Sequence, residues 1–177
     1  PGGWGAGYNK DGESGMVCSL DGETYIMSNE VIEVRYPIRV EQYSLNLRDK
    51  PGAGKFRGGH GIIKDYRVVN SHAVFTASFG RSKFPPWGMA GGHGGTPNYI
   101  IIYRKGKAPL KTRKAAAIQL QKGDLIRLVT GGGGGYGNPR ERDRTLVLRD
   151  VRDGYITAKE ARTIYGVKIG RMGRPRY

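Results

Sequence analysis

Five consecutive glycines at positions 131–135 constrain the fold of this chain more than any other feature. Each glycine in regular structure costs roughly 0.5 to 1 kcal/mol relative to alanine, because glycine loses more backbone freedom when it is ordered. The run follows a short apolar stretch at 125–129 and continues as Tyr136-Gly137-Asn138-Pro139. It is therefore either a disordered hinge or a segment whose backbone must touch its surroundings very closely.

A phosphate-binding loop would use such closeness, but the flanking residues argue against one. A P-loop ends in Gly-Lys-Ser or Gly-Lys-Thr at the start of a helix, whereas this run ends in Tyr136 and Gly137. A dinucleotide-binding fingerprint also fails, because no βαβ pattern with an acidic residue after a second strand surrounds the run. We therefore expect 131–137 to form extended, polyproline-like chain packed against 58–59 and 91–95.

Glycine is abundant along the whole sequence. Thirty of the 177 residues are glycine, well above the usual share of ~7%. Between the glycines, apolar residues alternate in strand-like runs, which indicates a folded protein rather than a disordered one. The segment 84–97 mixes prolines with glycines, a combination that favours extended left-handed chain without internal hydrogen bonds.

Alternating apolar residues predict a mainly β protein. One long strand is expected over 31–40, with Pro37 on an edge or at a bulge and a change of register near Gln42. A basic loop is expected over 104–114. The remaining predicted strands cover 25–27, 62–69, 73–79, 99–104, 115–121 and 125–129.

Helix signals appear only near the C-terminal end. Asp143 is expected to cap a helix that runs to Arg152. Thr157 and Glu160 have the spacing of a capping box for a second short helix, which is expected to end at Gly166. The sequence therefore predicts a helical hairpin after the strands.

These patterns together predict the fold class and the division of the chain into two parts. The class is mainly β, with a barrel-like β-sheet domain, glycine-rich polyproline II-type segments and a short C-terminal helical hairpin. The β-rich domain with its extended segments is expected over 1–142. The hairpin and a basic tail are expected over 143–177.

The chain is strongly basic, with 30 lysine and arginine residues against 15 aspartate and glutamate residues and a formal net charge of +15. Such a charge suits nucleic acid, an anionic substrate or an acidic partner subunit. Basic residues gather over 104–114 and in the tail, as RNA binding would require. Over 140–153, however, arginines alternate with acidic residues, which is typical of a self-paired or subunit-contacting surface. Nucleic-acid binding is therefore not favoured.

The sequence also bears on where the protein is located. No window approaches the ~20 continuous apolar residues of a spanning helix, and the first residues do not resemble a signal peptide. The sequence starts at Pro1 without a methionine, which suggests trimming or excision from something longer. Cys18 is the only cysteine, so an intrachain disulfide and a cysteine metal cage are excluded. A cytoplasmic location is expected.

Candidate site residues are few. His60 and His93 are the candidate catalytic residues, because each lies in a Gly-Gly-His-Gly context that can present an imidazole to a substrate. An ordinary loop histidine is the favoured alternative, and no metal site is assigned. Arg81 and Lys83 are the candidate substrate-binding cations. Because Cys18 has no basic neighbour in sequence and no serine lies in an elbow motif, a complete active site is not expected here.

Several motifs in a fixed order carry a resemblance to a known family. They are Gly2-Gly3-Trp4-Gly5-Ala6, Glu30-Val31-Ile32-Glu33 with Tyr36-Pro37-Ile38-Arg39-Val40-Glu41, Gly52-Ala53-Gly54-Lys55-Phe56-Arg57-Gly58-Gly59, Lys83-Phe84-Pro85-Pro86-Trp87-Gly88 with Gly91-Gly92, the stretch 131–143, and the terminal Val151-Arg152-Asp153-Gly154-Tyr155-Ile156 with Tyr165-Gly166-Val167. Together they closely resemble the C-terminal part of the hydantoinase B/oxoprolinase family over nearly the whole chain. Each motif is weak alone, but their shared order is fairly specific.

The resemblance implies a B-type subunit that works with an actin-like ATPase of the A type. Family members hydrolyse cyclic amides such as hydantoins or 5-oxoproline at the expense of ATP, and related complexes carboxylate acetone or acetophenone. ATP with Mg is implied on the A-type subunit, which phosphorylates the substrate, while the B-type subunit completes the reaction. The resemblance also implies a higher hetero-oligomer in which this chain joins the rest of the B-type subunit.

Some features of the family are missing or changed. Its metal-binding His and Asp residues are expected in the N-terminal part of the B-type subunit, so a possible divalent metal belongs there. Asn138 replaces the usual aspartate before Pro139, and Lys50-Pro51 stands where Asp-Ser-Gly-Gly is common. The expected function is the C-terminal portion of the B-type subunit of an ATP-dependent cyclic-amide hydrolase, inactive alone. The alternatives are the same subunit in an ATP-dependent ketone carboxylase and a basic RNA-binding or ribosomal-type protein.

Overall fold

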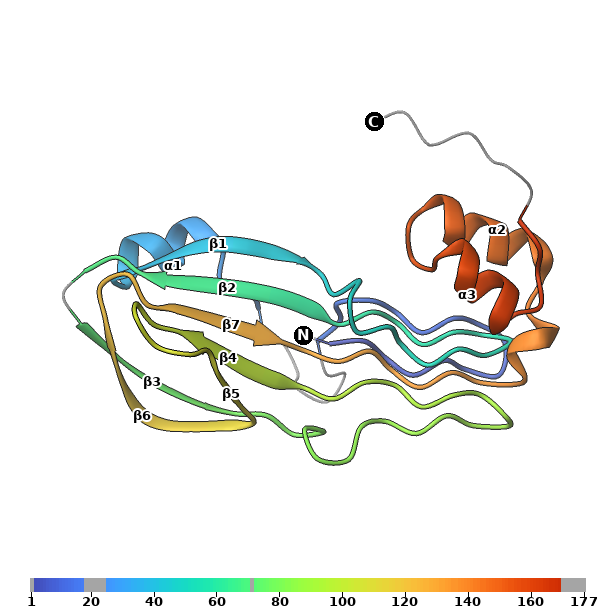
Figure 1. Cartoon of the computed structure of the whole chain (residues 1–177), viewed down its shortest axis with the longest axis horizontal. Coiled ribbons are helices and arrows are strands. Elements are labelled where there is room, and N and C mark those ends of the chain that lie inside the picture. The colour runs from blue at the N-terminus through green and yellow to red at the C-terminus, as the bar shows by residue number, and fades with distance from the viewer. Residues whose placement is uncertain (1, 18–24, 71, 170–177) are drawn as a thin grey trace.

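The computed structural model describes residues 2–17, 25–70 and 72–169. Figure 1 shows strands at one end of an elongated molecule, extended segments running side by side at the other, and two helices above those segments. The elements in chain order are α1 (Asn29–Arg35), β1 (Ile38–Leu45), β2 (Ile62–Val68), β3 (His72–Ser78), β4 (Tyr99–Tyr103), β5 (Leu110–Thr112), β6 (Lys114–Gln121), β7 (Leu125–Val129), η1 (Pro139–Glu141), α2 (Arg144–Arg152) and α3 (Ala158–Thr163). The mainly β class predicted from the sequence is confirmed.

The main sheet has the strand order β1-β2-β7-β4-β5, and all its described pairs are antiparallel. A register shift between Val40 and Gln42 confirms the predicted irregularity. The smaller sheet, β3 with β6, shares a core with the main sheet that includes the fully buried Ile100, Ile102 and Leu120. Because the main sheet ends at β1 and β5, it is open, and "barrel-like" describes it only loosely.

The glycine run lies buried among the extended segments, which together form a bundle. The N–H of Gly133 donates to the carbonyl oxygen of Gly59 at 3.0 Å, and the N–H of Gly135 donates to that of His93 at 2.9 Å. A Cβ atom on Gly133 would overlap the carbonyl of Trp4. Glycine is thus required for the close approach of backbones rather than for a left-handed conformation. The packing predicted for the run is confirmed.

The helical hairpin begins where its caps were predicted. The side chain of Asp143 accepts a hydrogen bond from the N–H of Thr145 at 2.7 Å at the start of α2. Thr157 and Glu160 form the capping box of α3. Helix α3 ends at Thr163, one turn earlier than the predicted end.

The hairpin has its own small core, which packs against the bundle. Val147, Ala161 and Tyr165 are buried together with Ala53, which comes from the bundle. This contact fixes the hairpin at the end of the molecule remote from β3 and β6, as Figure 1 shows. Among the described helices, none has both the length and the apolar character that crossing a membrane demands.

The strand expected over 31–40 is wrong in its first half. Helix α1 occupies that part, and β1 begins only at Ile38. Ser28 supplies an N-cap whose side chain accepts a hydrogen bond from the N–H of Val31. Pro37 has no N–H with which to continue a ladder, so the helix and the strand meet there. These local signals outweigh the alternation of apolar residues.

Two smaller predictions need correction. Residues 25–27 form no strand. The expected basic loop contains β5, which pairs with β4, and Lys114 at its end opens β6. The strands β5 and β6 form because they pair with β4 and β3, and composition alone does not show such pairing. Cys18 and most of the basic tail lie outside the described residues.

Candidate functional site

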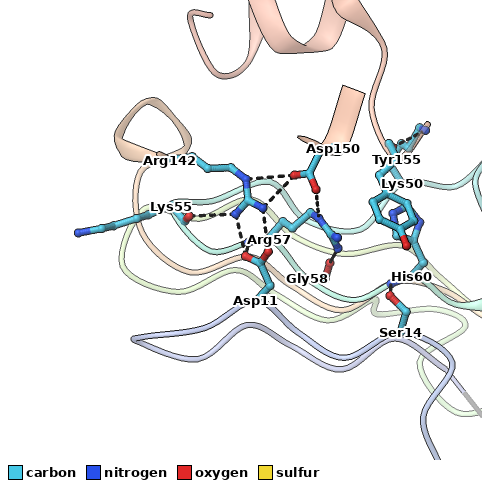
Figure 2. Close-up of polar contacts among 10 residues, drawn as sticks. All are labelled: Asp11, Ser14, Lys50, Lys55, Arg57, Gly58, His60, Arg142, Asp150 and Tyr155. Carbon is cyan, nitrogen blue, oxygen red and sulfur yellow. Dashed lines mark hydrogen bonds and ion pairs between the residues drawn. The ribbon is translucent and has the colours of Figure 1, made fainter. Parts of the chain in front are cut away.

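A network of buried charges joins the bundle to the helical hairpin (Figure 2). The side chain of Arg142 is fully buried. It donates two hydrogen bonds of 2.7 Å to the carboxylate of Asp11. It donates two more, of 3.1 and 2.8 Å, to Oδ2 of Asp150 on α2. A single guanidinium group therefore ties the N-terminal segment to the first helix of the hairpin.

Arg57 is the second cation of this network. Its Nε lies 3.3 Å from Oδ1 of Asp150, and its backbone N–H donates to Asp11 at 2.9 Å. The Arg57 guanidinium lies 4.7 Å from the ring centre of Tyr155, and that ring stacks on His60 with centres 5.2 Å apart. The charge network thus continues into a stack of aromatic rings.

Within this network, Asp11 and Arg142 stabilise each other's charge. Burial opposes the charge of Asp11, but hydrogen bonding and attraction from Arg142 outweigh it and keep the pKa of Asp11 below its usual value. Burial also opposes the charge of Arg142, but Asp11 and Asp150 raise the pKa of Arg142. Removal of one partner would leave the opposite charge buried without compensation.

His60 lies fully buried behind the network. Its Nδ1 lies 3.0 Å from the carbonyl oxygen of Asn46. Because a carbonyl only accepts, Nδ1 carries the proton and Nε2 presents a lone pair. Burial lowers the pKa of His60, and the positive charges of Arg57 and Lys50 lower it further. The ring is therefore neutral at pH 7.

A small cavity lies beside His60, at the junction of the bundle and the hairpin. Its volume is about 30 Å³, and its lining includes Lys50, Glu160 and Tyr165. Nε2 of His60 has no hydrogen-bond partner within the part of the chain that the structure describes. The cavity has room for about one water molecule. Substrate sites occupy several hundred Å³, so this cavity cannot admit a cyclic amide.

The other predicted site residues lie elsewhere. The side chain of His93 is exposed on the bundle, where its backbone bonds to Ala53 and Gly135. Arg81 and Lys83 are exposed near the turn after β3. The Arg81 guanidinium lies 5.1 Å from the ring centre of Trp87. None of the three lines the cavity beside His60.

Four of the five amides of the glycine run donate hydrogen bonds within the fold, which argues against a phosphate cradle. The N–H of Gly131 donates to the side chain of Asn98 at 2.7 Å, and that of Gly132 donates to the side chain of Thr96 at 2.9 Å. Two further glycines of the run donate to backbone carbonyls. An anion site needs such donors to be available. The run therefore does not fit a nucleotide.

The described residues also do not fit a bound metal. Within those ranges, no group of three or more histidine, cysteine, aspartate or glutamate side chains is arranged to hold an ion. The buried carboxylates of Asp11 and Asp150 accept hydrogen bonds from Arg142. The arrangement acts as a clamp between two parts of the fold.

Sequence reasoning missed the location of this clamp. Arg142 and Asp150 belong to the alternating charges over 140–153, a pattern that predicts a self-paired or subunit-contacting surface. Arg142 and Asp150 do pair with each other, but both side chains are buried rather than on a surface. A usable signal was present, because Asp150 lies three residues after Val147 and so shares its buried helical face.

Comparisons with known proteins agree with this fold. A family model for hydantoinase B/oxoprolinase matches residues 1–139. The B subunit of a putative D-/L-hydantoinase from a Pseudomonas species is 37% identical over 171 residues, which cover 95% of this chain and 28% of the relative. The beta subunit of the caprolactamase from Pseudomonas jessenii is 33% identical over 184 residues, which cover 96% of this chain and 30% of the relative.

Solved structures give the same result. The crystal structure of the ATP-dependent caprolactamase from Pseudomonas jessenii matches with a TM-score of 0.73 and 26% identity, over 97% of this chain and 30% of that chain. Acetone carboxylase matches with a TM-score of 0.72 over 92% of this chain and 26% of that chain, but at 19% identity it shows the fold alone. The chain thus spans between 26 and 30% of the length of these proteins. It belongs to the hydantoinase B/oxoprolinase family.

Proposed function

We propose that this chain is the C-terminal portion of the B-type subunit of an ATP-dependent amidohydrolase that opens cyclic amides of the hydantoin or 5-oxoproline type. One observation carries the proposal: the similarity to the B subunit of a hydantoinase and to the beta subunit of a caprolactamase extends over 95 and 96% of the chain. Both relatives take their names from cyclic amides. The chain alone is expected to be inactive, because it corresponds to only 28–30% of the hydantoinase and caprolactamase relatives.

The part that this chain plays in the enzyme is mainly architectural. The buried clamp of Arg142, Asp150 and Asp11 supports such a role, because it holds the hairpin on the bundle. His60 stabilises this junction through its contact with Tyr155. Arg81 and Lys83 remain the candidates for contact with substrate, since their side chains are exposed, whereas His93 is favoured as an ordinary loop histidine. The division into a β-rich domain over 1–142 and a hairpin unit over 143–177 is part of the same proposal.

The cofactors and partners follow from this assignment. ATP with Mg would bind an actin-like A-type subunit, and the rest of the B-type subunit would hold any divalent metal. The complete enzyme would be a hetero-oligomer in the cytoplasm. The occupied amides of the glycine run support a nucleotide site outside this chain.

The second candidate is an ATP-dependent ketone carboxylase with the same architecture. The fold shared with acetone carboxylase supports it, although the likeness reaches the fold only. No described residue of this chain separates the two chemistries.

One paired incubation distinguishes the candidates. The purified complex is incubated with ATP in two mixtures. The first contains a cyclic amide (hydantoin or 5-oxoproline), and the second contains acetone and labelled bicarbonate. We expect a ring-opened product in the first mixture and no fixed label in the second. Fixed label with acetone, in the absence of ring opening, would assign the complex to the carboxylases.

A further inference from the structure

An apolar groove opens where the two sheets meet, beside the link between α1 and β1. Its volume is about 400 Å³, and its lining includes Tyr36, Tyr66, Val68, Val74, Phe75 and Ile126. Among the described residues, none that lines it is charged. Val74 on β3 is 59% exposed. A contiguous apolar surface of this kind on a folded protein marks an interaction site.

Helix α1 ends next to the groove, because Tyr36, the residue that follows the helix, lines it. None of its residues is buried. Val34 is 90% exposed, and Val31 is 48% exposed. Isolated helices shorter than about 12 residues are marginal in water, and most helices gain their stability by burying an apolar face. In the seven-residue helix α1, the apolar side chains of Val31 and Val34 are therefore left uncovered by the described part of this chain.

The edge of the main sheet indicates how a partner can approach. The N–H of Val40 on the edge strand β1 donates to Oε1 of Glu33 in α1 at 2.8 Å. That amide is therefore unavailable to an added strand, as in sheets whose edges are covered by a helix. A partner would lie over α1 and in the groove rather than extend the sheet at Val40.

The length of the relatives identifies the occupant. This chain corresponds to 28–30% of the hydantoinase and caprolactamase relatives. In those proteins more than two thirds of the same polypeptide lies outside the matched part. The uncharged lining of the groove does not suit nucleic acid and favours an apolar protein segment.

We propose that α1 and the apolar groove dock an apolar segment of the remaining part of the B-type subunit, carried on the same or a second polypeptide. This proposal rests on the proposed function, because that function requires a B-type subunit larger than this chain. The docking surface is where this chain would meet the remaining part of that subunit. Docking would bury the side chains of Val31, Val34 and Val74 and complete the core that α1 lacks.

Photo-crosslinking from inside the complete complex tests the surface directly. A photo-reactive residue replaces Val34 or Val74, and mass spectrometry identifies the linked peptides. We expect links to peptides from the part of the B-type subunit that precedes the region matched here. Links to the ATP-binding subunit or to a second copy of this chain would overturn the proposal, and so would the absence of links. The control position is Tyr8, which is 76% exposed and does not line the groove.

A binding measurement provides the second test. The Val34→Asp variant should weaken the binding of this chain to the purified remaining part of the B-type subunit at least tenfold. The melting temperature of the chain should not change, because Val34 is 90% exposed. Phe84→Asp, at a residue that is 71% exposed outside the groove, should bind as the parent does. Unchanged binding of the Val34→Asp variant would contradict the docking even if the complex hydrolyses cyclic amides. If the complex does not hydrolyse cyclic amides, the crosslinks would still show the docking surface.

Discussion

Removal of the carboxylate of Asp150 should be the most damaging single change to the buried clamp. Asp150 is fully buried and holds the guanidinium groups of Arg142 and Arg57. Asp150→Ala would leave Asp11 as the one carboxylate bound to Arg142, beside the carbonyl of Lys55, and would remove the carboxylate that Arg57 contacts. Breaking a buried ion pair by removing one partner costs about 3–5 kcal/mol, because the remaining charge is uncompensated. The hairpin would then detach from the bundle or the whole chain would unfold.

Urea unfolding followed by circular dichroism measures this loss. With a slope of about 2 kcal/mol per molar urea, the midpoint should fall by roughly 1.5–2.5 M. The matched control is Arg152→Ala on the same helix, since the Arg152–Asp153 pair is exposed. Surface pairs contribute about 0–1 kcal/mol, so this midpoint should move by less than about 0.5 M. Equal shifts for the two variants would refute the claim that the buried network holds the hairpin in place.

Three further predictions concern the glycine run and the histidines. Gly133→Ala should prevent soluble folding, because the added Cβ would overlap the carbonyl of Trp4. Gly80→Ala should fold as the parent does, because nothing lies within 4 Å of a Cβ added there. Equal yields of soluble protein for the two variants would contradict the packing of the glycine run. Because folding lowers the pKa of His60, the unfolded chain takes up a proton first as the pH falls below 6.5. The free energy of unfolding should therefore decrease as the pH falls below 6.5. In the His60→Gln variant, the urea midpoint should decrease less between pH 6.5 and 5 than in the parent. An equal decrease in the two proteins would exclude His60 as the cause. His93→Ala should leave the turnover of the complete complex within tenfold of the parent, and a larger loss, above about 1.4 kcal/mol, would give His93 a direct role.

Much of the fold could be predicted from local patterns. The caps at Asp143 and Thr157 use hydrogen bonds between residues two or three apart, so the sequence alone contains them. The packing of the glycine run was predictable because so many adjacent glycines have few other physical explanations. The alternation of apolar residues over 31–40 gave a wrong prediction of one strand. The cap at Ser28 begins a helix, and Pro37 separates that helix from the strand β1.

The candidate site was much less predictable. The clamp joins Asp11 to Arg142, which are 131 positions apart, and no local pattern relates them. His60 was identified for its glycine context, but its burial against Tyr155 depends on where the hairpin docks. Long-range contacts of this kind follow from the packing of the bundle and the hairpin, which single-sequence patterns do not encode.

The product formed by the complete complex shows whether this chain belongs to an ATP-dependent enzyme that opens cyclic amides. The purified complex, with ATP and hydantoin or 5-oxoproline, is followed for ADP and for the ring-opened product in the same samples. We expect ADP and the ring-opened product to accumulate together, and neither to form when this chain is omitted. Ring opening without ATP, or ATP-dependent fixation of bicarbonate onto a ketone with no ring opening, would contradict this expectation.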